Sequence, residues 1–161
     1  MIDFLSACAG AAASLLLALV SYHYQQWKAD VQNRIALFYQ SQHQVLRNRN
    51  LLSLAQLHPD TKEMLLDKVQ FLPAYPFANF DILDDGFRSL ADFYDKALVR
   101  ALSEDMDFHS FESVSIHSLD SINGLILLWS EHLKKRMLLY FLLPFLLRRI
   151  RRELMQKNPQ P

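Results

Sequence analysis

Glycine and cysteine are scarce in this chain of 161 residues, which has three glycines and a single cysteine. So few glycines, among long stretches rich in leucine and alanine, exclude a turn-rich β fold and favour helices. One cysteine excludes an intrachain disulfide framework and a zinc site built from cysteines. The sequence therefore predicts an all-α protein, with a core supplied by aliphatic and aromatic side chains.

The known signatures of chemistry are also missing. The sequence has no P-loop, no dinucleotide-binding glycine pattern, no HExxH and no nucleophile elbow. The stretch from Asp81 to Gly86 resembles a calcium loop, but its carboxylates do not alternate as an EF-hand requires. Two pairs, His109 with Glu112 and His117 with Asp120, have the spacing of neighbours on one helical face. We expect no metal site, no cofactor and no catalytic residue.

One long hydrophobic run is present near the N-terminus, from Phe4 to Val20. Its length is close to the roughly 20 residues that a helix needs to cross a bilayer. The run lacks the basic start and the cleavage site of a signal peptide, and at Cys8 the apolar core follows the lipobox-like letters instead of preceding them. The sequence therefore predicts an uncleaved transmembrane anchor over residues 1–24.

Small residues recur in this run at helical spacing. On a helix they form a smooth face where a second backbone can approach closely. We therefore expect a second transmembrane helix as a partner, either from another copy or from a heteromeric membrane complex. The predicted helix-packing face consists of Ser6, Ala9, Gly10, Ala13 and Ser14.

The flanks of the run predict its orientation. Lys28 and Arg34 follow the run, whereas Asp3 precedes it, so the positive-inside rule places the N-terminus outside and the bulk of the chain in the cytoplasm. Aromatic side chains just after the run are typical of a membrane interface. The predicted location is a single pass of the plasma (inner) membrane, with Tyr22, Tyr24 and Trp27 at the interface.

Charge is distributed in three blocks although the net charge is zero. The charges sum to +2 over residues 1–58, −9 over 59–131 and +7 over 132–161. The acidic middle disfavours binding to nucleic acid and to anionic lipid, while the basic C-terminal block favours an anionic surface. We expect membrane lipid, and not nucleic acid, as the partner of the basic block.

Residues 137–147 are apolar and lie between two basic clusters. Eleven residues of helix reach about 16 Å, too short for a bilayer core of about 30 Å. Two alternatives remain open: the segment lies in the membrane interface, or it packs in a protein core or a partner's groove. The predicted interface residues are Lys134, Lys135, Arg136, Arg148, Arg149, Arg151 and Arg152.

Helix signals predict how the rest of the chain is organised. From Gln25 to Leu57 there is no proline or glycine, so the anchor helix is expected to continue to Leu57. The alternate seam positions of its seven-residue repeat are not large and apolar, which favours packing on its own domain over a self-associating stalk. They are Arg34, Ser41, Asn48 and Ala55. Further helices are predicted over 61–72, with Asp60 and Glu63 as a capping box, over 87–102, and from about 119 to 143, where Pro144 should kink or split the last one.

These elements define four regions. They are an anchor over 1–24, a cytoplasmic helical domain over 25–131, an apolar-basic amphipathic helix over 132–155 and a disordered tail over 156–161. We expect a non-catalytic single-pass membrane protein that acts as an accessory, regulatory or scaffolding subunit. The alternatives are a membrane-disrupting effector whose C-terminal segment inserts on oligomerisation, and an enzyme with an unrecognised acidic and histidine site.

Overall fold

The computed structural model describes the backbone of residues 2–77 and 82–157, and the side chains of 11–12, 14–77 and 83–136. All regular structure in these ranges is helical, which confirms the all-α prediction. The elements are α1 (Ile2–Leu57), the 3-10 turn η1 (Pro59–Thr61), α2 (Lys62–Leu66), α3 (Ile82–Leu102) and α4 (Phe108–Lys157).

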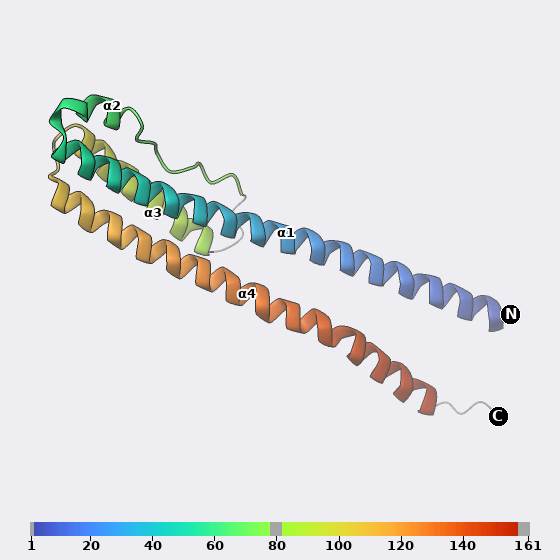
Figure 1. Ribbon diagram of the computed structural model, residues 1–161. Helices are drawn as coiled ribbons and strands as arrows, with labels where there is room; N and C mark the ends of the chain where they lie inside the picture. Colours follow the sequence, from blue (N-terminus) through green and yellow to red (C-terminus); the bar gives the residue numbers. More distant parts are fainter. Residues whose placement is uncertain (1, 78–81, 158–161) are drawn as a thin grey trace.

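The three long helices form an elongated bundle (Figure 1). Helices α1 and α3 run in the same direction, because Arg34 lies beside Asp84 and Asn48 beside Tyr94. Helix α4 runs back along both of them. The short α2 and the segment after it cover one side of the bundle. As a result, the free ends of α1 and α4 leave the bundle at the same end of the molecule.

The core of α1 follows the seven-residue repeat seen in the sequence. Val31, Phe38, Val45 and Leu52 are all buried in one core cluster that also contains residues of α3 and α4. The alternate seam positions are buried as well, although three of them are polar: Arg34, Ser41 and Asn48. Both halves of the repeat therefore face the protein's own core. Over this part of α1, the prediction of packing on its own domain is confirmed.

Helix α4 begins earlier than the sequence suggested. Its first residue is Phe108, whereas the predicted start is near Leu119. Asp107 caps the helix by accepting the N–H of Ser110 at 2.9 Å, which satisfies a backbone donor at the helix start. At the other end the helix continues through Pro144 to Lys157, so Pro144 does not split it.

The connection between α1 and α3 also differs from the prediction. Helix α2 ends at Leu66, not Leu72, and Thr61 precedes it without a side-chain cap. The predicted capping box is therefore wrong. Instead, the backbone of Gln70 forms hydrogen bonds with the side chain of Asn48. The N–H of Leu72 donates a hydrogen bond to the side chain of Asp95. Such contacts from neighbouring helices hold this segment extended where its local pattern favoured a helix.

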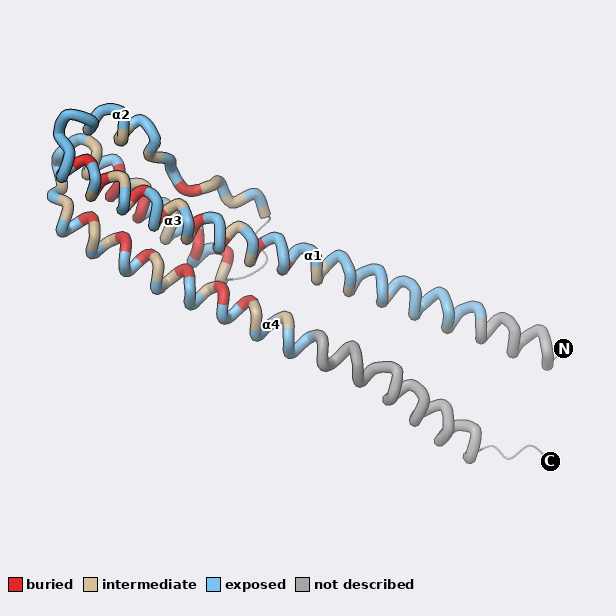
Figure 2. Tube along the Cα trace, in the orientation of Figure 1, coloured by how far each residue is buried: buried red, intermediate tan, exposed pale blue. Residues whose placement is uncertain are grey.

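The first part of α1 extends beyond the bundle (Figures 1 and 2). Here Leu15, Leu16, Leu17 and Leu19 are between 48 and 66 % exposed. Within the described residues, no helical stretch combines the length and the apolarity that crossing a membrane requires. The transmembrane part of the predicted fold is therefore not supported, while its helical part is confirmed.

Candidate functional site

The end of the bundle from which α1 and α4 extend brings two predicted sets of residues together. The guanidinium of Arg136 on α4 lies 4.9 Å from the ring centre of Trp27 on α1, a cation–π geometry. Tyr24 lies next to Trp27, with their ring centres 6.1 Å apart. Tyr22 is exposed, and its hydroxyl accepts a hydrogen bond from the side chain of Gln26, one helical turn further along α1. We call this group, Tyr22, Tyr24, Trp27, Lys134, Lys135 and Arg136, the aromatic-basic belt.

The belt marks the level at which the bundle ends. Lys134, Lys135 and Arg136 are exposed, so their charges are directed to the surroundings rather than neutralised in the core. Amphipathic rings beside basic side chains form a composition that suits the boundary between water and an anionic surface. The sequence placed these residues in two separate segments, and the contact between Trp27 and Arg136 joins them.

Several other predicted site residues cannot be placed in this way. Ser14 lies on the exposed extension of α1. The remaining side chains of the predicted packing face and of the last basic cluster fall outside the described side chains. They are Ser6, Ala9, Gly10, Ala13, Arg148, Arg149, Arg151 and Arg152.

A buried ion pair lies just inside the belt. The side chain of Arg34 is 3 % exposed and that of Asp84 is completely buried, with Arg34 Nε 3.2 Å from Asp84 Oδ1. The hydroxyl of Tyr75 donates a hydrogen bond to the same carboxylate. The guanidinium also lies over two rings, 4.7 Å from the centre of Phe77 and 5.2 Å from that of Trp129. These contacts connect α1, α3, α4 and the extended segment.

The ionisation of this cluster is fixed by its surroundings. Burial disfavours the charge on Arg34, but hydrogen bonds to Asp84 and Tyr75 outweigh it, so the pKa of the guanidinium is raised. Burial, together with the hydrogen bond to Asp84, raises the pKa of the Tyr75 phenol. The phenol therefore stays protonated and keeps donating its hydrogen bond. This is a structural cluster, since all its polar groups are used in holding helices together.

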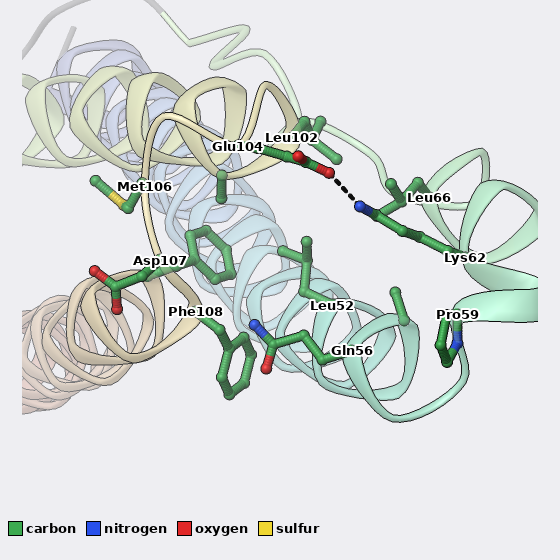
Figure 3. A pocket seen from close by; sticks show the side chains of 13 residues that line it. Leu52, Gln56, Pro59, Lys62, Leu66, Leu102, Glu104, Met106, Asp107 and Phe108 are labelled. Atoms are coloured by element: carbon green, nitrogen blue, oxygen red, sulfur yellow. Dashed lines mark hydrogen bonds and ion pairs between the residues drawn. The ribbon is translucent and has the colours of Figure 1, made fainter.

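The opposite end of the bundle contains a partly open cavity of about 420 Å³. Figure 3 shows that it lies between the end of α1, α2, and the turn from α3 to α4. Its walls include Leu52, Leu102 and Phe108, and an ion pair between Lys62 and Glu104 lies at its edge. The lining is mixed, because Gln56 and Asp107 lie in it beside the apolar side chains and the ion pair. This cavity could not be predicted from local patterns, because its lining comes from four separate segments of the chain.

The two predicted histidine–carboxylate pairs lie together on α4, where His109, Glu112, His117 and Asp120 line one pocket. Glu112 is held by Arg49, whose Nε lies 3.1 Å from its carboxylate, so it is not free to pair with His109. No group of three or more potential metal ligands occurs among the residues that the structure describes. Asp84 pairs with Arg34, and Arg34 in turn lies over the ring of Trp129 on α4. Trp129 is twelve residues, or about 18 Å of helix, from His117. Asp84 and the histidine pairs of the predicted alternative site therefore lie far apart.

Comparisons with protein-family models, with curated proteins and with solved structures return no match for this chain.

Proposed function

We propose that this protein is a non-catalytic, membrane-attached accessory subunit. In this proposal the helical bundle stands at the cytoplasmic surface of the plasma (inner) membrane, and the extensions of α1 and α4 enter or lie against the membrane. The observation that carries the proposal is the exposed extension of α1, with leucines on several sides of one helix. A helix that is apolar all round requires an apolar environment, either lipid or another protein.

The energetics favour a covered extension. Burying one leucine side chain contributes about 1.5–3 kcal/mol, so four half-exposed leucines leave several kcal/mol to be gained. The aromatic-basic belt supports lipid as the covering medium, because it places cations and amphipathic rings where the exposed leucines end. The finer assignment, a single pass with the N-terminus outside, rests on the sequence alone.

Vesicle flotation with the full chain tests membrane attachment. We expect the protein to float with vesicles that contain anionic phospholipid, and a Leu15→Asp, Leu16→Asp variant to stay unbound. The matched control is Leu57→Asp at the far end of α1, where the leucine is 70 % exposed. Because Leu57 is distant from the belt, this control should float normally. If the wild-type protein stays unbound, or if both variants float equally well, the lipid assignment is wrong.

Purification in mild detergent tests the subunit assignment separately. A second protein present in stoichiometric amount in the purified particle would support an accessory subunit and identify the complex. A particle that contains this chain alone would refute the heteromeric form of the proposal. Depolarisation of cells on expression, lost when residues 137–152 are deleted, would instead establish the membrane-disrupting alternative.

A further inference from the structure

The segment between α2 and α3 runs along the bundle as an extended chain (Figure 1). Residues 67–77 contain no helix, and we call them the strap. Within the described residues, α1 and α3 each pack closely on α4, whereas their own backbones approach each other at few points. The backbone of the strap bonds to Asn48 of α1 and to Asp95 of α3. The strap therefore occupies a groove whose two walls are α1 and α3.

Side chains from both walls bind the backbone of the strap. Asn48 Nδ2 donates to the carbonyl of Gln70 at 2.7 Å, and the N–H of Gln70 donates to Asn48 Oδ1 at 3.3 Å. Two residues further on, the N–H of Leu72 donates to Asp95 Oδ1 at 3.1 Å. Residues i and i+2 of an extended chain present their backbone groups to the same edge, so the two walls together bind one edge of the strap. Any residue except proline can supply these N–H groups.

Two side chains of the strap insert into the groove. Leu72 is 7 % exposed and belongs to the core cluster. Three residues later, the ring of Tyr75 lies parallel to that of Phe38, with ring centres 6.5 Å apart, and its hydroxyl donates to Asp84. Phe71, by contrast, is 57 % exposed. The groove therefore selects side chains at two positions, a large aliphatic residue and, three residues later, a tyrosine.

The polar groups of the groove are costly to the fold but suited to an extended backbone. Asn48 is completely buried, and hydrogen bonds to Gln44 and Tyr94 fix the orientation of its amide. Burial raises the pKa of Asp95 and so disfavours its charge. Buried polar groups cost free energy unless they are hydrogen-bonded, and apolar residues could join two helices without this cost. Pre-oriented groups that lower stability are typical of binding surfaces.

Few apolar contacts hold the strap in place. Neither η1 nor α2 has a buried residue, and Leu72 is the only buried residue from position 58 to position 77, all of which the structure describes. The neutral hydrogen bonds to the strap add little net stability, because water replaces them when the strap leaves. Both α1 and α3 keep their packing on α4 in that state. Segments with so little burial open without unfolding of the whole domain.

We infer that the groove between α1 and α3 binds an extended segment of a partner protein, and that the strap occupies this groove in the free chain. The partner segment has a large aliphatic residue followed three residues later by tyrosine, and no proline at the positions equivalent to Gln70 and Leu72. Because the strap is tethered, its effective concentration at the groove is in the millimolar range, so only a segment with additional contacts displaces it. The inference assigns a contact surface to the proposed accessory subunit, but it does not require attachment to a membrane.

Binding of a labelled peptide to the full chain in mild detergent tests the groove. The peptide has the sequence of residues 67–77, and its fluorescence anisotropy reports binding. In a Leu72→Ser, Tyr75→Ser chain the strap lacks both inserted side chains, so we expect the peptide to bind at least roughly tenfold more tightly than to the wild-type chain. Addition of Asn48→Leu to this chain should abolish binding. The matched control, Asn50→Leu at an exposed position of the same helix, should leave binding unchanged.

Three results would overturn the inference. The first is a folded Leu72→Ser, Tyr75→Ser chain, as judged by helical circular dichroism, that does not bind the peptide. The second is equal binding of a peptide in which alanine replaces both inserted residues. The third is peptide binding that survives Asn48→Leu, because the peptide would then lie outside the groove.

Hydrogen exchange of the wild-type chain tests the opening of the strap without any substitution. We expect the N–H of Leu72 to exchange roughly a hundredfold or more faster, after correction for intrinsic rates, than the N–H groups of Val45 and Leu98 in the helices. Equal protection would mean that the strap leaves only when the whole bundle unfolds, and the inference would be wrong. Both experiments are carried out without lipid vesicles, so their failure is distinct from a failure of flotation or of co-purification.

Discussion

Removal of the Asp84 carboxylate should strongly destabilise the bundle. In Asp84→Ala, the guanidinium of Arg34 stays 3 % exposed and loses its buried counter-ion, while Tyr75 loses its hydrogen-bond acceptor. Breaking a buried pair in this way costs about 3–5 kcal/mol. Asp30 remains 3.3 Å from Arg34 on the solvent side and offsets part of the loss, which sets the expected value near the lower end, about 3 kcal/mol.

Replacement of both partners should have the opposite outcome. In the double variant Arg34→Met, Asp84→Leu no buried charge remains, and apolar side chains of similar size fill the space between Phe77 and Trp129. Such exchanges are neutral or stabilising by about 1–4 kcal/mol. The double variant should therefore be clearly more stable than Asp84→Ala, although the Tyr75 hydroxyl loses its acceptor in both variants.

Urea unfolding in mild detergent, followed by helical circular dichroism, measures both effects. A stability of about 5–15 kcal/mol is typical of a domain, so a loss of about 3 kcal/mol shifts the unfolding midpoint clearly. A cost below about 1 kcal/mol for Asp84→Ala would mean that water reaches the pair, and the account of a buried cluster would be wrong. A double variant less stable than Asp84→Ala would refute the account in the same way.

Three further substitutions test local features of the fold. Asp107→Ala should lower the unfolding free energy by about 1 kcal/mol, measured by urea titration, because the N–H of Ser110 loses its cap. Glu104 has a φ of 62°, a backbone conformation that costs a non-glycine residue about 1 kcal/mol. Glu104→Gly should therefore raise the melting temperature, because the strain relieved exceeds the stabilisation that the exposed ion pair with Lys62 contributes. Burial raises the pKa of Asp95 above its unfolded value of 3.8, so its contribution to stability is present below that pH and lost as the pH rises through the folded pKa. Asp95→Asn should therefore be more stable than the wild-type protein at neutral pH, and urea midpoints measured from acidic to neutral pH should show the difference disappearing towards acid.

Much of the helical organisation could be predicted from the chain itself. The absence of proline and glycine from Gln25 to Leu57 predicts a continuous helix, and α1 includes this range. The apolar spacing from Phe87 onwards predicts α3, which begins five residues earlier at Ile82. Periodicity finds such elements because one face of each helix is buried along its whole length.

The buried polar residues could not be predicted in the same way. Arg34 and Asn48 look like interruptions of an apolar seam, yet both are buried because partners distant in sequence satisfy them. Arg34 is paired with Asp84, and Asn48 bonds to the carbonyl of Gln70 at 2.7 Å and to the hydroxyl of Tyr94 at 3.3 Å. Local patterns contain no information on such partners, so the cluster around Arg34 and Asp84 could not be predicted.

The unbroken course of α1 has a mechanical consequence. From Ile2 to Leu57 it is a single rod of about 84 Å, without a flexible joint between the extension and the bundle. A rod of this kind transmits rotation, because its hydrogen bonds resist twisting and leave no linker to absorb it. Any turn imposed on the exposed leucines by their surroundings therefore turns Tyr39 and Leu46 through the same angle, at the opposite half of the molecule. The exposed end of the helix thus sets the direction in which the rest of the protein faces.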